Sequence, residues 1–282
     1  MANDDDKYPG NSGRRRFVKG VVGSAALAGV GTTAGAMINA TTNPSGSGGG
    51  STQYIGVEHI DGPAPRAMPM IPIEIDAQGY IKGVFPKWKT TTVSGKQVQT
   101  ATMQVGDVEY SVDWFQYCGV QTYGGLQPDA QQDNYFRYSD APPYSWQQEQ
   151  VQAGQKINVA DFSDYTTWGD GIGQSGLGKP AMGTWRSQGE KETMPVQVLR
   201  IPPARWGKVD CDSPSFLKAA SSQNFIAWLD KCTHFCCVPG FKALAQSERF
   251  DAENDIYCPC HQSVYNPYNL VKQTFVALPR PA

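Results

Sequence analysis

The sequence has no strong excess of charge of either sign, few histidines and no visible internal repeat. Its 24 Lys and Arg residues nearly balance 26 Asp and Glu residues, and the net charge of −2 gives no electrostatic reason to expect nucleic acid as a partner. Seven cysteines among 282 residues are too few for a disulfide-based scaffold. The hydrophobic content of 40% is ordinary, so the chain can bury a sizeable core in one large domain or two smaller ones.

Histidine is scarce, yet two of the 3 histidines lie in two short segments that also contain cysteine. These segments are Cys232-Thr233-His234-Phe235-Cys236-Cys237 and Cys258-Pro259-Cys260-His261-Gln262-Ser263. Each offers one cysteine and one histidine as metal ligands and carries a further cysteine. Two thiolates and two imidazoles on two loops are what a mixed-ligand 2Fe-2S cluster requires, with both thiolates on one iron and both imidazoles on the other.

The spacing of these residues resembles the pattern of the Rieske iron–sulfur proteins. That pattern is C-x-H with a second cysteine a few residues later, followed by C-x-C-H-x-S. The resemblance implies that Cys232 and Cys258 bind one iron of a single 2Fe-2S cluster. It implies that His234 and His261 bind the other iron. We therefore expect these four residues to form a metal centre near the C-terminal end of the chain.

The same resemblance gives roles to four neighbouring residues. It implies a disulfide bond between Cys237 and Cys260 that ties the two loops together. It places Ser263 and Tyr265 where high-potential members of the family have hydroxyl groups that hydrogen-bond to cluster sulfur. A stable disulfide of this kind implies an oxidising compartment outside the cytoplasm.

The chain also departs from the family pattern. Cys236 replaces the usual glycine between the first histidine and the disulfide cysteine, and Gln262 replaces the glycine before the serine. The stretch between the loops, residues 238–257, is longer than we expect for the family. The cysteines that are neither expected ligands nor members of the expected disulfide are Cys118, Cys211 and Cys236. One of these three is free, or Cys118 and Cys211 form a second disulfide, and the sequence does not decide between these possibilities.

Two alternatives to a cluster follow from the same residues. Two cysteines and two histidines can hold a structural zinc ion in tetrahedral geometry. Zinc sites usually pair C-x₂₋₄-C with H-x₃₋₅-H, however, whereas here cysteine and histidine alternate within each segment. Four of the cysteines could instead form structural disulfides only, but that arrangement leaves both histidines unexplained.

The N-terminal sequence indicates export. Arg14-Arg15-Arg16-Phe17-Val18-Lys19 precedes a mildly apolar stretch and resembles a twin-arginine export signal. That route suits a protein that acquires its cofactor before it crosses the membrane. The alternative is a basic flank that obeys the positive-inside rule, and both interpretations place residues 1–19 in the cytoplasm.

Residues 20–40 carry no charge and are long enough to cross a hydrocarbon core of ~30 Å. Small residues dominate this run, which makes it marginal as a lone helix in lipid but suitable for packing against a partner helix. A cleaved signal with the cut near Ala34-Gly35-Ala36 is the alternative. We favour a single retained transmembrane helix because the resembled family keeps its anchor. Residues 41–52, rich in Gly and Ser, then form a flexible hinge.

The fold expected for residues 53–282 is mainly β, a Rieske-like antiparallel domain with a cluster-binding subdomain at about 230–270. Alternation of apolar and polar residues predicts strands over 71–75 and 108–114, the latter paired with 101–105 across a turn at Gly106-Asp107. Further expected elements are strands over 196–201 and 225–229 and a short helix from Ser213-Pro214 to near Ala220. Residues 116–189 show no clear pattern and are expected to form an insertion or extra strands, with Trp146, Trp168 and Trp185 used in packing.

The resemblance implies a membrane-anchored Rieske subunit of a cytochrome bc-type, quinol–cytochrome c reductase complex. Its head would lie on the outer or periplasmic face of the cytoplasmic membrane. It would take one electron from a quinol bound on a cytochrome b-type subunit and pass it to a cytochrome c or a copper protein. His261, with His234 beside it, would contact the quinol and accept its proton. The alternatives are a Rieske subunit of a periplasmic oxidase such as arsenite oxidase, or an exported binding domain stabilised by zinc.

Overall fold

The computed structural model describes residues 50–278 except residue 94. The predicted export signal, the anchor and most of the hinge therefore lie outside the described residues. Within residues 50–278, apart from that one position, no helix has both the length and the apolar character needed to cross a membrane. Ser51 and Thr52, which the sequence analysis assigned to the hinge, open the first strand, so the domain begins slightly earlier than expected.

The described chain is mainly β, and its sheets are built almost entirely from antiparallel pairs, as the sequence predicts. The largest sheet is organised by two long strands, β1 (Ser51–Asp61) and β15 (Val264–Val276), which pair from Ser51↔Val276 to Asp61↔Val264. Its shorter strands are β2 (Met68–Pro69), β11 (Asp210–Cys211), β13 (Gly240–Phe241) and β14 (Ile256–Tyr257). Of these, β11 pairs in parallel with β15.

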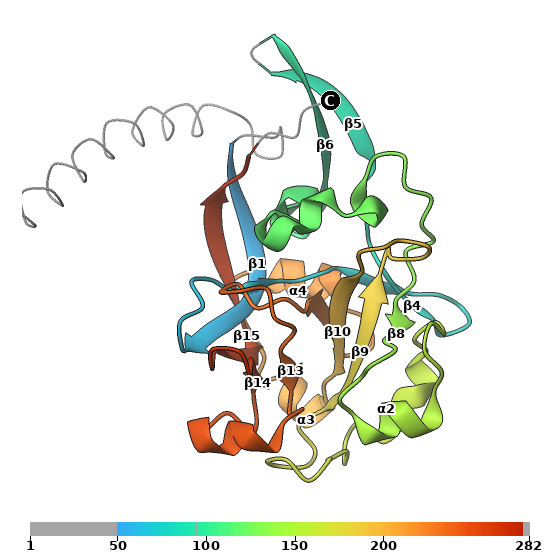
Figure 1. Ribbon diagram of the computed structural model, residues 1–282, viewed down its shortest axis with the longest axis vertical. Coiled ribbons are helices and arrows are strands. Elements are labelled where there is room, and N and C mark those ends of the chain that lie inside the picture. Colours follow the sequence, from blue (N-terminus) through green and yellow to red (C-terminus); the bar gives the residue numbers. More distant parts are fainter. Residues whose placement is uncertain (1–49, 94, 279–282) are drawn as a thin grey trace, which may run out of the picture.

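A second antiparallel sheet lies beside the first (Figure 1). Its strands, in sheet order, are β12 (Phe225–Leu229), β10 (Met194–Arg200), β9 (Lys179–Trp185) and β8 (Arg137–Tyr138). Every residue of β12 is buried, which explains its uninterrupted apolar sequence. Because β12 ends only three residues before Cys232, this buried strand places the first cysteine segment directly on the core.

Two smaller sheets complete the β structure. One is the pair β3 (Ile73–Ile75) and β4 (Ile81–Gly83). The other contains β5 (Trp88–Val93), β6 (Lys96–Val105) and β7 (Val108–Ser111), and its β5–β6 hairpin extends away from the body (Figure 1). The predicted turn at Gly106-Asp107 joins β6 to β7, and Gly106 has a positive φ of 59° there. The strand predicted to reach Trp114 ends at Ser111, because the Ser111 side chain accepts the Asp113 N–H and starts a short 3₁₀ helix.

The helices are short and sit at the edges of the sheets. The α-helices are α2 (Ser145–Gln150), α3 (Pro203–Trp206) and α4 (Pro214–Ala220). The 3₁₀ helices are η2 (Val112–Phe115), η3 (Tyr117–Thr122), η4 (Gly124–Leu126), η5 (Val159–Phe162) and η6 (Ala245–Phe250). The predicted helix from Ser213-Pro214 is confirmed as α4, with Ser213 Oγ accepting the Phe216 N–H at 3.1 Å as its N-cap.

Residues 116–189 extend the second sheet. They supply β8 and β9, which pair with each other, and β9 also pairs with β10. The three tryptophans in this stretch, Trp146, Trp168 and Trp185, are all buried in the main hydrophobic core, as predicted. Residues 116–189, the insertion, are therefore packed into the same domain as the rest of the described chain.

Candidate metal centre

The two cysteine–histidine segments form two loops with the same backbone hydrogen bonds. In the first loop (residues 232–237), the Cys232 N–H donates to Cys237 O at 2.7 Å, and the Cys236 N–H donates to Cys232 O at 3.0 Å. In the second loop (residues 258–263), the Cys258 N–H donates to Ser263 O and the Gln262 N–H donates to Cys258 O, both at 2.9 Å. We call these loop 1 and loop 2. Each therefore presents its first cysteine in an equivalent position.

The fifth residue of each loop has left-handed backbone geometry. Cys236 has φ 65° and Gln262 has φ 63°, a conformation that glycine adopts without strain and other residues adopt at a cost. These are the two positions where the resembled family has glycine. The two departures noted in the sequence thus fall where the loop closure itself favours glycine, and this chain accepts strain at both.

The first cysteine of each loop is buried, and the two thiols lie side by side. Cys232 is 1% exposed and Cys258 is 0% exposed. A hydrogen bond from the Cys258 thiol, together with smaller contributions from the Tyr265 hydroxyl and the His234 N–H, lowers the pKa of Cys232 to about 5. The same contact with Cys232, reinforced by burial, raises the pKa of Cys258. The contact between the two thiols thus favours the thiolate at Cys232 and the protonated form at Cys258.

The two histidines lie on the solvent side of this pair. The His234 and His261 rings are 4.8 Å apart between centroids, at an interplanar angle of 84°. Phe235 packs against both rings, with centroid distances of 4.5 Å and 5.0 Å, and is itself 64% exposed. His234 is half-buried and His261 is exposed. The arrangement is therefore layered, with thiols inside and imidazoles outside.

Two polar side-chain atoms of loops 1 and 2 are buried without a partner. Ser263 Oγ is buried without a hydrogen bond of normal geometry, although it lies close enough to Cys232 to favour its thiolate form. His234 Nδ1 is also buried without a partner. An unpaired buried polar atom costs free energy unless a water, an ion or another group pairs with it. Thiols and imidazole nitrogens are the donor types that a sulfur- and nitrogen-ligated iron centre takes.

Tyr265 connects β15 to both the thiol pair and loop 1. Its buried hydroxyl donates to Cys232 Sγ at 3.3 Å and accepts the Thr233 N–H at 3.0 Å. Burial, followed by the hydrogen bond to Cys232, raises the pKa of Tyr265, so the hydroxyl remains a donor across the physiological range. His59, the histidine outside the loops, packs edge-on against the Tyr265 ring at 5.5 Å. Thr233 and His59 are site neighbours that no motif in the sequence indicates.

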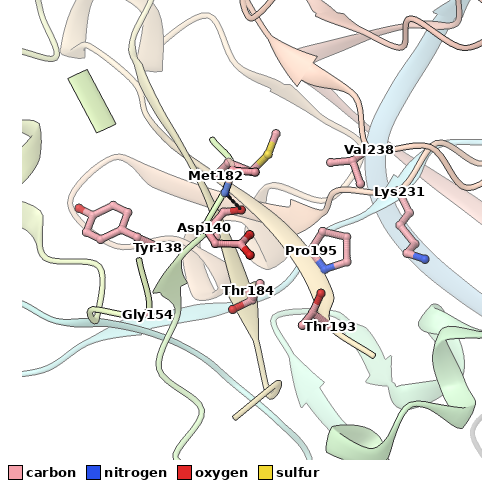
Figure 2. Close-up of a pocket in the computed structure, with 12 residues that line it drawn as sticks. Tyr138, Asp140, Gly154, Met182, Thr184, Thr193, Pro195, Lys231 and Val238 are labelled. Atoms are coloured by element: carbon pink, nitrogen blue, oxygen red, sulfur yellow. Dashed lines mark hydrogen bonds between the residues drawn. The ribbon is translucent and has the colours of Figure 1, made fainter. Parts of the chain in front are cut away.

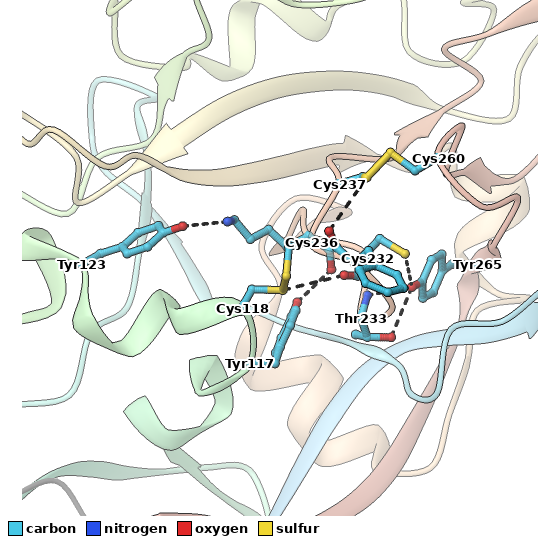
Figure 3. Close-up of a disulfide and its surroundings, with 11 residues drawn as sticks. Tyr117, Cys118, Tyr123, Cys232, Thr233, Cys236, Cys237, Cys260 and Tyr265 are labelled. Carbon is cyan, nitrogen blue, oxygen red and sulfur yellow. Dashed lines mark hydrogen bonds between the residues drawn. A yellow bond between two sulfur atoms is a disulfide. The ribbon is translucent and has the colours of Figure 1, made fainter.

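Two disulfide bonds meet in loop 1 (Figure 3). Cys237 and Cys260 are bonded with a Cα–Cα distance of 6.6 Å, which is the pairing that the resemblance implies. Cys236 is bonded to Cys118 with a Cα–Cα distance of 5.6 Å. Cys211 is a free thiol, so the Cys118–Cys211 pairing left open by the sequence does not form.

The first bridge lies directly against a candidate ligand. The Sγ atoms of Cys237, Cys258 and Cys260 all lie within 4.8 Å of one another. Because two of these sulfurs are already bonded to each other, Cys258 is the only one of the three with a free thiol. On the other side of loop 2, Gly62 approaches so closely that a Cβ would lie 2.5 Å from Gln262 O. Loop 2 is thus held on both sides by close packing.

A cavity of about 510 Å³ opens over the β8–β9–β10 sheet beside loop 1 (Figure 2). Its lining includes Tyr138, Asp140, Thr184, Thr193 and Lys231. The four candidate iron ligands are not among the residues that line it. The candidate metal centre and this cavity are therefore separate features of the molecule.

Comparison with known proteins found no matching family model, no matching curated protein and no matching solved structure. The case for a function therefore rests on the residues and geometry of the site.

Proposed function

We propose that this chain is an electron-transfer protein that binds one Rieske-type 2Fe-2S cluster between loops 1 and 2. The observation that carries the proposal is the layering of the site, with two buried thiols on one side and two adjacent imidazoles on the solvent side. A mixed-ligand cluster needs this separation because one iron takes sulfur and the other takes nitrogen. In this proposal Cys232 and Cys258 hold the inner iron, and His234 and His261 hold the outer iron.

When bound, a cluster with these ligands accepts one electron at a potential between about −150 and +300 mV. The surrounding residues determine where in that range it falls. Tyr265 donates to Cys232 Sγ, and Ser263 has a free hydroxyl beside the same thiol. Hydrogen bonds to cluster and ligand sulfur favour the reduced, more negative state. These two hydroxyls support a place at the high-potential end, which suits oxidation of a quinol.

His261 is the residue that we propose contacts the quinol, with His234 next to it. An iron-bound imidazole has one ring nitrogen left over, and the exposed ring of His261 can present that nitrogen to a substrate. Negative charge added nearby increases the proton affinity of such a nitrogen. His261 can thus hold the proton that a quinol releases with its electron. Phe235, packed on both rings, limits water access to them.

The cellular role we propose is that of a membrane-anchored subunit of a cytochrome bc-type respiratory complex. Its partners would be a cytochrome b-type subunit that binds the quinol and a cytochrome c or copper protein that accepts the electron. The twin-arginine motif and the apolar run over 20–40 support a head outside the cytoplasmic membrane. Two disulfides in the described residues fit an oxidising compartment. On its own the chain would be an electron carrier.

The direct test is metal and sulfide analysis of the full-length protein purified from membranes. The proposal predicts two iron atoms and two acid-labile sulfides per chain, with a reduced-state electron paramagnetic resonance spectrum typical of mixed ligation. One zinc per chain without labile sulfide would replace the proposal with a zinc-stabilised binding domain. A cluster that no quinol reduces, in the purified protein or its complex, would favour a subunit of a periplasmic oxidase such as arsenite oxidase.

A further inference from the structure

Loop 1 is held by a segment that the Rieske resemblance does not include. This bracing segment, residues 117–123, contains η3 and belongs to the insertion. The Tyr117 hydroxyl donates to Lys231 O at 3.0 Å, and Lys231 Nζ donates to the Tyr123 hydroxyl at 2.7 Å. The bracing segment therefore makes two hydrogen bonds with Lys231, which immediately precedes loop 1, in addition to the Cys118–Cys236 bond.

The adjacent cysteines 236 and 237 are bonded in different directions (Figure 3). Cys236 is joined to Cys118 in the bracing segment, and Cys237 is joined to Cys260 in loop 2. Both cysteines of the Cys118–Cys236 bond have a left-handed backbone conformation, with φ 60° at Cys118 and 65° at Cys236. Glycine would be less strained at position 236, so the cysteine there must contribute something that glycine does not.

We propose that the Cys118–Cys236 bridge is a positioning pair for the metal centre, fixing loop 1 so that Cys232 keeps its geometry toward the Tyr265 hydroxyl. The proposal rests on the proposed function. The link runs through Thr233, whose N–H donates to the Tyr265 hydroxyl while that hydroxyl donates to Cys232 Sγ. A displacement of loop 1 therefore changes the hydrogen bond at the sulfur. The Cys237–Cys260 bridge ties loop 1 to loop 2, which joins β14 to β15 of the first sheet, whereas the Cys118–Cys236 bridge ties loop 1 to the insertion that extends the second sheet.

The test is the double variant C118S/C236G in the full-length protein. Glycine suits the left-handed position, so the backbone of loop 1 can still close and all four ligands are retained. We expect the cluster to form. We expect its midpoint potential to be lower than in the wild type, because the Tyr265 hydrogen bond to Cys232 weakens. We also expect cluster loss on heating to be about ten-fold faster or more.

The matched control is C211S, which removes a free thiol that takes part in neither bridge. It should leave the potential and the rate of cluster loss at wild-type values. The milder variant Y117F removes only the hydrogen bond to Lys231 O and should shift the potential in the same direction by a smaller amount. This variant keeps the proposal testable if C118S/C236G fails to fold.

Two results would overturn the proposal. One is peptide mapping of the non-reduced wild type that finds Cys118 and Cys236 as free thiols while Cys237–Cys260 is bonded. The other is a C118S/C236G protein with wild-type potential and spectrum but a lower unfolding temperature, which would make the bridge a stabiliser only. Failure of the proposed function is distinguishable, because a wild type without iron and sulfide would fail before any variant is compared.

Discussion

At the scale of single residues, the Ser263 and Tyr265 hydroxyls near Cys232 are the groups that we expect to raise the midpoint potential of the proposed cluster. Ser263→Ala and Tyr265→Phe should each lower the midpoint potential while the cluster is retained, since each removes a donor beside the same sulfur. Redox titration followed by electron paramagnetic resonance measures the change. Ser247→Ala and Tyr268→Phe are matched controls, because Ser247 Oγ is also buried without a partner and the Tyr268 hydroxyl donates to Leu177 O rather than to a cysteine. Unchanged potentials in the two site variants would show that these hydroxyls do not reach the cluster sulfurs.

Asp255 gives a pH-dependent prediction for stability. Burial raises the pKa of the Asp255 carboxyl to about 6, and repulsion from Glu253 adds to this effect. Attraction to Arg205 opposes it but is smaller. The unfolded chain has the ordinary value of about 3.9, so the folded state binds a proton that the unfolded state releases between these values. Stability should therefore fall as pH rises from about 4 to about 6. Since solvent partly reaches the carboxyl, we expect a loss of about 1 kcal/mol.

Chemical denaturation of the wild type and Asp255→Asn across this pH range measures the effect. The asparagine variant cannot ionise at this position, so the difference in unfolding free energy between the two proteins should change with pH in the stated direction. Parallel pH profiles for both proteins would contradict the assignment of the raised pKa to Asp255.

At the scale of elements, the equivalent closure of the two loops makes a prediction about Gln262. Its left-handed φ of 63° costs about 1–2 kcal/mol, whereas glycine costs about 0.5–1 kcal/mol in lost chain freedom on folding. Gln262→Gly should therefore stabilise the protein by about 0.5 kcal/mol and raise its unfolding temperature slightly. Gln97→Gly, an exposed position within β6, is the control and should destabilise. Destabilisation of similar size in both variants would show that position 262 carries no backbone strain.

Elements with strong local signals were predictable from the sequence. The helix after Ser213-Pro214 and the strand at 225–229 form where predicted, because a cap and an apolar run act through near neighbours. The strand expected to reach Trp114 ended early because the Ser111 side chain competes for the backbone. The insertion was unreadable because the two-residue β8 depends on pairing with β9 far along the chain, and β9 contains Pro180 and Gly183, which are unusual inside strands.

The candidate site was predictable only in its loops. The Cys232 and Cys258 thiols lie side by side, the His234 and His261 rings lie next to each other, and the neighbouring Cys237 and Cys260 are bonded. The partner of Cys236 was not predictable, since Cys118 is 118 residues away and no local pattern joins them. The one feature of the sequence that could have indicated this bond is Cys236 itself, a cysteine at a position where the family has glycine. Thr233 was missed because it acts through its backbone N–H, which every residue except proline possesses.

At the scale of the whole molecule, the core supports the site through the Cys118–Cys236 bond as well as through β12 and β15. In the chain-entropy account, a disulfide that closes a loop of this length contributes about 5 kcal/mol to the free energy of unfolding. The insertion is packed around buried Trp146, Trp168 and Trp185, so it gives the bracing segment a fixed base. Through the Cys118–Cys236 bridge, loop 1 is connected to the second sheet as well as to the first.

The account also predicts that electron and proton binding are coupled in the assembled protein. The midpoint potential should fall at alkaline pH, because the ligand histidines lose protons and the added negative charge disfavours reduction. Potentiometric titration at a series of pH values measures this. A potential that does not depend on pH would remove His261 and His234 as proton-accepting groups while leaving electron transfer in place.

The central claim is that loops 1 and 2 hold a cluster with sulfur ligands on one iron and nitrogen ligands on the other. Electron paramagnetic resonance of the reduced full-length protein, with pulsed detection of nitrogen couplings, tests it most directly. The account predicts a low-temperature signal with an average g value below the free-electron value and couplings to two nitrogens, lost in His234→Cys or His261→Cys. A protein with zinc, or with a cluster that shows no nitrogen coupling, would contradict it.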